Sequence, residues 1–175
     1  MSAPTGKMMV SLEDKAACVK ITGRATFASS VDLKTLFTEL RQREFGCFVL
    51  DLSECTLMDS TFLGVLAGFG LKMNDLKAGD AGRALELFNP SSRIIELLEN
   101  LGVLHLFKVT QGERALPGKT ELTHLAPANP TREEVTRTCL EAHELLMQIN
   151  PQNVARFKDV AQFLAEDLKN LKPAP

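Results

Sequence analysis

The segment from residue 47 to residue 74 most constrains what this chain can fold into. Residues 47–52 are almost entirely apolar, which is typical of a strand buried at the middle of a sheet. A short polar turn follows, and an apolar helix is predicted from about Ser60 to Asn74. A buried strand joined to a buried helix requires a layered α/β structure in which helices pack on a sheet.

The rest of the first 110 residues fits the same architecture. Strands are predicted at residues 8–12, 16–22 and 83–88, with a last strand inside 103–109. A capping-box helix start is predicted at residues 29–32, and a further helix is predicted after Asn89-Pro90. Strands that alternate with helices in this way predict an α/β fold with a mixed β-sheet and helices over one of its faces.

The polar turn delivers Asp59, Ser60 and Thr61 to the start of the apolar helix. At a helix N-terminus the backbone N–H groups lack partners and the macrodipole is positive, so a side-chain oxygen or a phosphate is stabilised there. From this local chemistry alone, Ser60 serves either as the helix cap or as a functional hydroxyl.

Composition excludes several functional classes. The net charge of -2 argues against direct nucleic-acid binding, and the absence of Trp and Tyr leaves few aromatic rings for base stacking. No apolar stretch approaches the roughly 20 residues that span a bilayer, and the N-terminus carries no basic segment followed by an apolar one. The sequence therefore predicts a cytoplasmic protein without a membrane span.

Neither a cofactor nor a metal is expected. The chain has no phosphate-binding glycine loop and no Gly-x-Ser-x-Gly elbow, and no histidine lies near Ser60 in the sequence. The cysteines and histidines show no ligand spacing; they are Cys18, Cys47, Cys55, Cys139, His105, His124 and His143. The sequence predicts reduced thiols, no metal site, no catalytic residues and no enzymatic activity.

The motif around Ser60 resembles a known family signature. A strand ending in Asp51-Leu52-Ser53 is followed, after five residues, by Asp59-Ser60-Thr61 and then by Leu63-Gly64-Val65-Leu66. This order resembles the STAS domain of bacterial anti-sigma factor antagonists over roughly residues 7–110. The resemblance includes Ile21-Thr22-Gly23-Arg24 and the segment 100–107.

The resemblance implies a role in signalling. It implies that Ser60 is the phosphorylated residue, with Thr61 as second choice. The unphosphorylated form would bind an anti-sigma factor that is itself a serine kinase, and a phosphatase is a further expected partner. Asp59, Ser60, Thr61, Phe62, Val65 and Phe69 are the residues expected to contact partners.

Two positions depart from the family pattern. Phe62 stands where members usually have glycine, and Thr26 stands where kinase substrates often have an acidic residue. Both departures favour an alternative, in which the chain is a STAS scaffold or regulatory subunit that works without phosphorylation. Stress-signalling assemblies and transport complexes employ such subunits.

Three regions are predicted along the chain: a STAS domain at 1–110, a linker at 111–130 and a helical appendage at 131–172. Thr131-Arg132-Glu133-Glu134 is a second capping box, and a break at Asn150-Pro151 separates two amphipathic helices. The pair has three interpretations: a helical hairpin packed on its own domain, a homodimer contact, or capture of another protein.

The motif helix carries a second apolar stripe, which lies away from its ordinary inward face. Phe62, Val65, Phe69 and Met73 form this stripe. A helix that is apolar on two faces is either enclosed in the protein or presents an interaction surface. We expect Phe62, Val65 and Phe69 to contact the C-terminal helices or a partner, the alternative being cover by loops of the same domain.

Overall fold

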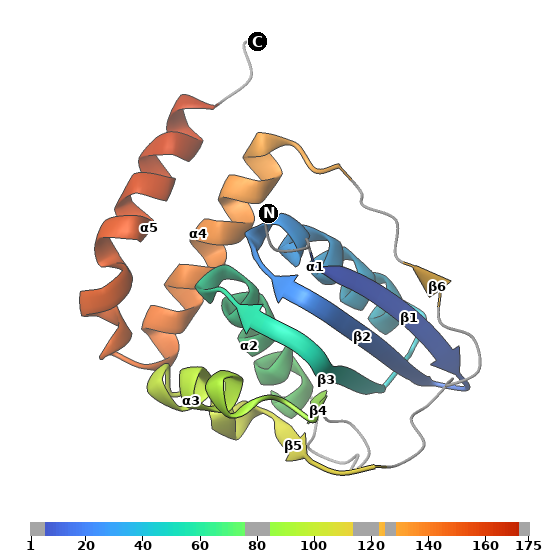
Figure 1. Cartoon of the computed structure of the whole chain (residues 1–175). Helices are drawn as coiled ribbons and strands as arrows, with labels where there is room; N and C mark the ends of the chain where they lie inside the picture. Colours follow the sequence, from blue (N-terminus) through green and yellow to red (C-terminus); the bar gives the residue numbers. More distant parts are fainter. Residues whose placement is uncertain (1–5, 76–84, 114–122, 125–128, 172–175) are drawn as a thin grey trace, which may run out of the picture.

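The computed structural model describes residues 6–75, 85–113, 123–124 and 129–171 (Figure 1). Within these residues the predicted helices and strands follow one another in the predicted order. The last strand predicted within 103–109 is instead a 3-10 turn at 104–106 and a strand at 108–110, and a short strand at 123–124 lies in the predicted linker. The strands are β1 (Lys7–Glu13), β2 (Ala16–Ala25), β3 (Cys47–Met58), β4 (Leu85–Phe88), β5 (Lys108–Thr110) and β6 (Thr123–His124). The helices are α1 (Phe27–Gln42), α2 (Ser60–Asp75), α3 (Ser92–Asn100), the 3-10 turn η1 (Leu104–Leu106), α4 (Arg132–Ile149) and α5 (Asn153–Asn170).

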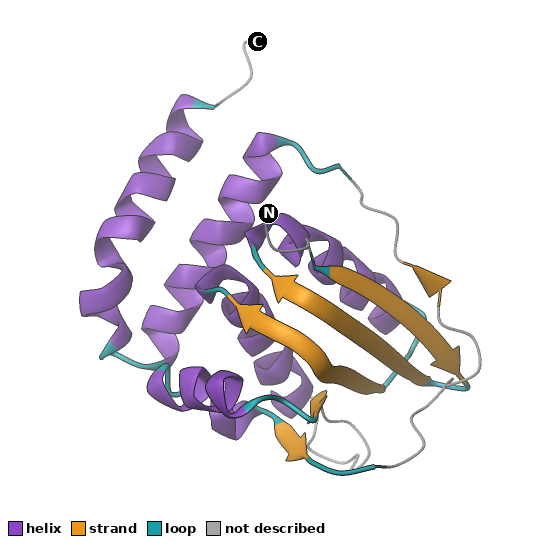
Figure 2. Cartoon of the chain, in the orientation of Figure 1, coloured by secondary structure: helices purple, strands orange, loops and turns teal. Residues whose placement is uncertain are grey.

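The strands form one mixed sheet in the order β5-β4-β3-β2-β1-β6. Strands β2, β3, β4 and β5 pair in parallel, whereas β1 is antiparallel to both of its neighbours. Helices α1 and α2 lie together behind the sheet in the view of Figure 1, and Figure 2 shows the same two layers by element type. The predicted mixed sheet with helices over one face is confirmed.

Strand β3 is longer than predicted, because the polar segment after Leu52 continues the strand. Its pairing with β2 shifts register twice, once between Lys20 and Thr22 and once between Gly23 and Arg24. Each shift adds a residue to β3 as a β-bulge does, so the strand keeps its partner through a polar sequence. The extension carries the chain to Met58, immediately before the Asp59 motif.

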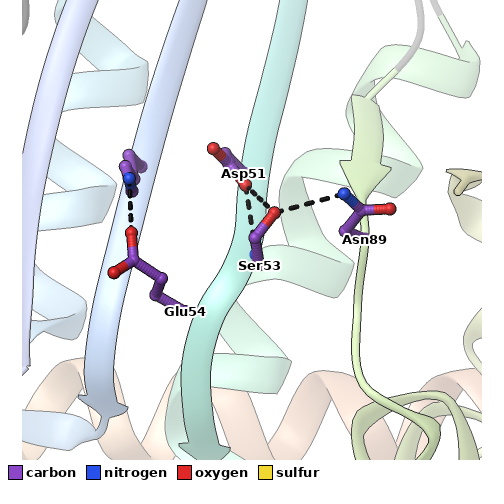
Figure 3. Close-up of polar contacts among 5 residues, drawn as sticks. Asp51, Ser53, Glu54 and Asn89 are labelled. Atoms are coloured by element: carbon purple, nitrogen blue, oxygen red, sulfur yellow. Dashed lines mark hydrogen bonds and ion pairs between the residues drawn. The ribbon is translucent and has the colours of Figure 1, made fainter. Parts of the chain in front are cut away.

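Polar contacts hold the exposed side chains of β3 in place (Figure 3). Asp51 accepts hydrogen bonds from the backbone N–H of Ser53 at 3.0 Å and from its hydroxyl at 2.6 Å. The Asn89 amide donates to the same hydroxyl at 3.3 Å. Glu54 pairs with Lys20 and raises the pKa of that ammonium group. Asp51 therefore organises the strand, as expected of a strand-end acceptor.

The two C-terminal helices form a hairpin that packs on the first domain. Thr131 caps α4 as predicted, since its hydroxyl accepts the Glu134 N–H at 3.1 Å. Helix α4 lies against α1 and α2, and α5 lies outside α4 (Figure 1). Of the three interpretations of this appendage, the structure shows the packed hairpin.

Contacts before and after α4 attach this part of the chain to the first domain. The buried Asn153 amide donates to the carbonyl oxygens of Leu101 at 2.9 Å and Leu146 at 2.8 Å, which ties the α4–α5 turn to the end of α3. Within the predicted linker, β6 adds to the sheet by pairing with Met9 and Val10 of β1. Residues 114–122 and 125–128 of that linker lie outside the described residues.

Candidate functional site

Asp59 fixes the start of two helices at once. One carboxylate oxygen accepts the N–H of Phe62 at 2.8 Å, which caps α2, and the other accepts the N–H of Phe27 at 2.7 Å, at the start of α1. The second contact explains why α1 begins at Phe27, with Thr26 as its cap, instead of at the predicted capping box near Ser29. The cap of α2 is therefore Asp59, and the interpretation of Ser60 as the cap is wrong.

Replacing Asp59 by alanine is expected to destabilise the protein by about 2 kcal/mol, because two N–H groups at helix starts lose their acceptor. Urea unfolding followed by circular dichroism measures the change. Asp59→Asn, which keeps one acceptor oxygen, should lose less than Asp59→Ala, and Thr56→Ala at an exposed position of β3 should be neutral. Equal stabilities for Asp59→Ala and Thr56→Ala would contradict the double cap.

The hydroxyl of Ser60 contacts a histidine from the C-terminal hairpin. Ser60 Oγ lies 2.8 Å from His143 Nε2, although the two residues are 83 positions apart in the chain. Ser60 is half-buried, whereas His143 is only 4% exposed. Docking of α4 therefore brings an imidazole directly onto the hydroxyl at the start of α2.

The surroundings of His143 fix which atom carries its proton. Nδ1 lies 2.7 Å from the carbonyl oxygen of Cys139, and because a carbonyl oxygen only accepts, Nδ1 is the protonated nitrogen of the neutral ring. Nε2 then presents a lone pair, so the Ser60 hydroxyl donates to it. The Phe157 ring of α5 packs edge-on against the imidazole, with ring centres 5.0 Å apart.

Thr61 is buried in the same interface. It is 5% exposed, and its side chain forms a hydrogen bond with the Cys139 thiol of α4. Burial raises the pKa of Cys139 and outweighs the opposing effect of this hydrogen bond. The Cys139 thiol is therefore neutral and shielded while α4 is docked.

Small residues let α4 approach α2 closely. A Cβ atom placed on Gly64 would lie 2.6 Å from the Ala142 Cβ and 2.7 Å from the Ala142 carbonyl oxygen. One turn further along, a Cβ on Gly68 would lie 3.2 Å from the tip of Leu145. The face of α2 that starts at Ser60 thus receives α4 through two glycines.

The second apolar stripe of α2 is enclosed by the protein. Phe62 is fully buried, Val65 and Phe69 are 8% and 6% exposed, and Phe69 packs edge-on against Phe37 of α1. Of the three residues expected to contact C-terminal helices or a partner, Val65 and Phe69 line a cavity shared with α4, and Phe69 also packs against Phe37 of the first domain. Little of these three side chains is open to a partner in the described arrangement.

A cavity of about 290 Å³ lies between α1, α2 and α4. Its lining combines apolar groups with charged and hydroxyl groups at the rim: Lys34, Thr38, Gly64, Val65, Gly68, Phe69, Leu71, Lys72, Thr138, Glu141, Ala142 and Leu145. An ion pair of 2.9 Å between Lys34 and Glu141 joins α1 to α4, and both side chains are largely exposed. The α2–α4 interface is therefore tightly packed at Gly64 and open on the α1 side.

His143 is the site residue that the sequence did not reveal. It lies four residues after Cys139 and next to Ala142, so it belongs to the predicted apolar stripe of α4. A histidine within an apolar stripe is a signal that this histidine faces another element. The pattern did not identify Ser60 as its contact, because the two residues meet only through the docking of α4 on α2.

Two further findings bear on the class of site. Across residues 6–75, 85–113 and 129–171, no three His, Cys, Asp or Glu side chains gather as metal ligands would. None of the helices in the described part of the chain is both long and apolar enough to cross a bilayer.

Structural comparison relates the first domain to antagonists of anti-sigma factors. The Bacillus cell fate determinant SpoIIAA in its phosphorylated form matches with a TM-score of 0.50 and 13% identity, over 62% of this chain and 92% of that one. A candidate anti-sigma factor antagonist from Thermotoga maritima matches with a TM-score of 0.50 and 16% identity, over 59% and 85%. At these identities the likeness shows a shared fold.

Sequence comparison gives the family. No curated protein matches the chain. The family model described as "Mlab, STAS domain" matches residues 8–109, which is more than half of the chain and ends before α4 begins. The chain therefore belongs to the STAS domain family and carries α4 and α5 as additional C-terminal helices.

Proposed function

We propose that this protein is a regulatory interaction module whose binding to a partner is set by phosphorylation of Ser60. The observation that carries the proposal is the position of Ser60. It is the first residue of α2 in a STAS domain, and its hydroxyl takes no part in capping the helix because Asp59 caps it. Capping of α2 therefore does not engage this hydroxyl, which can accept a phosphoryl group.

Ser60 is a better acceptor than Thr61. Ser60 is half-buried, whereas Thr61 is 5% exposed and forms a hydrogen bond with Cys139. A kinase has to reach the attacking oxygen, so phosphorylation of Thr61 requires a larger opening of the structure than phosphorylation of Ser60. Thr61 remains the second choice.

The added charge is large enough to act as a switch. A phosphoserine carries about -1.5 to -2 charges at neutral pH, and here it would lie next to the carboxylate of Asp59. A repulsion and desolvation penalty of about 3 kcal/mol in a partner interface is roughly a hundredfold loss of affinity. The unphosphorylated form is therefore the binding form.

The expected partner is an anti-sigma factor with serine kinase activity, and a phosphatase would reset the switch. The name of the Thermotoga maritima relative, a candidate anti-sigma factor antagonist, supports this class of partner. We place the protein in the cytoplasm, where a sigma factor acts. Homodimerisation remains a prediction; α5 offers Val160 and Phe163, which are 43% and 73% exposed.

The test uses an acidic residue in place of the phosphate. Full-length Ser60→Asp and wild-type protein are compared as baits for a serine kinase from the native cells, and binding of the isolated kinase is then measured by calorimetry. Ser60→Asp should bind about a hundredfold more weakly. Ser92→Asp is the matched control, because Ser92 is the exposed first residue of α3. Equal binding by Ser60→Asp and wild type would contradict the switch.

A second candidate function is a STAS scaffold or transport subunit that works without phosphorylation. The contact that favours it is the hydrogen bond from Ser60 to His143, which occupies the hydroxyl within the chain. Incubation with the native kinase fraction and labelled ATP separates the two candidates. If the wild-type protein is labelled and the Ser60→Ala variant is not, the result supports the phosphorylation switch. If neither protein is labelled, the result supports the scaffold function.

The Ser60–His143 pair also has to be weighed as a catalytic dyad. His143 supplies the base that the sequence alone did not place near Ser60. Its Nδ1 donates to a backbone carbonyl, however, and in a catalytic triad a carboxylate takes that position and stabilises the protonated ring. We therefore retain the prediction that the protein is not an enzyme and assign no catalytic residue.

A further inference from the structure

The face of α2 that begins at Ser60 is filled by a helix of the same chain. Ser60, Gly64 and Gly68 are spaced four residues apart, so they lie on one face of α2. His143 contacts the first of them, and Ala142 lies over the second at a distance that leaves no space for a Cβ atom on Gly64. The face has the shape that a closely crossing helix requires.

We propose that this face is an interaction surface for a helix, that α4 occupies it in the unphosphorylated chain, and that phosphorylation of Ser60 expels α4. The proposal rests on the proposed phosphorylation of Ser60. A partner that binds the unphosphorylated chain would have to displace α4, and it would present a helix with the same chemistry. That helix would carry a small residue over Gly64 and a hydrogen-bond acceptor over Ser60, as Ala142 and His143 do in α4.

The chemistry of phosphorylation removes the contact that holds α4 at this point. Transfer of the γ-phosphoryl group from ATP breaks the bond between the γ-phosphorus and the β–γ bridging oxygen, forms the Oγ–P bond and releases ADP. The hydroxyl proton passes to the general base of the kinase. The resulting ester oxygen cannot donate to His143 Nε2, and the 2.8 Å between Oγ and Nε2 leaves no space for a phosphorus atom in the direction of the ring. The neighbouring carboxylate of Asp59 also repels the phosphate.

The docked face of α4 has the composition of an exchangeable interface. Half of its fully buried residues are polar, namely Thr136, Thr138 and His143, and the others are Cys139, Ala142 and Leu146; Leu145 and Ile149, which are partly buried, also pack on the core. Permanent interfaces are more hydrophobic than exchangeable ones. The cavity beside Gly64 and the exposed Lys34–Glu141 ion pair contribute little to the binding of α4 to the first domain. Helix α4 is therefore suited to leaving α2.

Opening should begin in the N-terminal half of α4, which carries Cys139. The opposite end is tied to α3 by the two hydrogen bonds of Asn153. Cys139 is 9% exposed and its pKa is raised by burial, so its thiol reacts slowly while α4 is docked. Reactivity of Cys139 therefore reports the opening.

The test uses the full-length chain with phosphoserine incorporated at position 60 during translation. Alkylation by N-ethylmaleimide is followed by peptide mass spectrometry, with the unmodified chain for comparison. We expect Cys139 to react at least tenfold faster in the phosphorylated chain. Cys55, which is 4% exposed within the sheet, should remain unreactive in both, because the first domain stays folded.

Phosphoserine at position 92 is the matched control, and it should leave Cys139 as protected as in the unmodified chain. Equal protection of Cys139 in the Ser60-phosphorylated chain would overturn the proposal, since α4 would then stay docked. Alkylation of Cys55 together with Cys139 would also overturn it, because it would show general unfolding. Either failure leaves the proposed function open to its own test, which is partner binding by Ser60→Asp.

Discussion

Gly64→Ala is expected to separate α4 from α2 while the sheet and its first two helices stay folded. The new Cβ atom would lie 2.6 Å from the Ala142 Cβ and 2.7 Å from the carbonyl oxygen of the same residue, so backbone has to move apart. Overpacking of this kind costs about 3 kcal/mol, which exceeds what a glycine-to-alanine change gains in helix stability, about 1 kcal/mol.

Gly68→Ala is the matched control for that substitution. Its Cβ atom meets only the tip of the Leu145 side chain, at 3.2 Å, and a flexible side chain can give way. Hydrogen–deuterium exchange measures both variants. In Gly64→Ala the amides of α4 and α5 should exchange faster while those of β2 and β3 keep their protection, and Gly68→Ala should match wild type. Unchanged exchange of α4 in Gly64→Ala would contradict the close crossing at Ala142.

His143→Ala is expected to lower the free energy of unfolding by about 2–3 kcal/mol. The substitution removes the acceptor for Ser60 and the donor to Cys139, and it leaves a void against the Phe157 ring. Because those contacts join α2, α4 and α5, we expect docking of the hairpin to be weakened most. Chemical unfolding and the alkylation rate of Cys139 together measure the effect.

Two control variants help to interpret the effect of His143→Ala. His105→Ala should be neutral, because His105 is exposed in η1. His143→Phe keeps the volume and removes both polar contacts, so it should recover packing against Phe157 without restoring the hydrogen bond to Ser60. A stability of His143→Ala equal to that of wild type would show that the Ser60–His143 contact does not hold α4.

Much of the first domain could be predicted from the sequence because its signals are local. The apolar run at residues 47–52 and the helix from Ser60 are both present as predicted, and Ser91 caps α3 where the Asn89-Pro90 break had indicated a start. These elements are determined by apolar periodicity and by turn residues that act within a few positions. The cap at Thr131 could be predicted for the same reason.

The features that were missed depend on contacts between distant parts of the chain. The end of β3 was placed too early because its polar residues pair with β2 through bulges, which periodicity does not show. The start of α1 was placed too late because the carboxylate that binds Phe27 comes from Asp59, 32 residues away. Local propensity cannot identify either contact.

The site itself was predicted only in part. Asp59, Ser60 and Thr61 lie together at the start of α2 as the sequence indicated, but Asp59 supplies the cap and Ser60 donates to His143. Phe62, Val65 and Phe69 were expected to contact the C-terminal helices or a partner. The structure buries all three and places Val65 and Phe69 at the cavity beside α4, and contact with a partner stays a prediction. Helix α2 has two apolar stripes because the sheet, α1 and α4 all pack around it.

The phosphorylation state of Ser60 in native cells tests the proposed switch most directly. Phosphopeptide mass spectrometry of the full-length protein, purified across growth and stress conditions, measures occupancy at Ser60 and Thr61 separately. A switch predicts phosphate on Ser60 whose occupancy changes with conditions, and little on the buried Thr61. Absence of phosphate from Ser60 under every condition would contradict it and would favour the unphosphorylated scaffold.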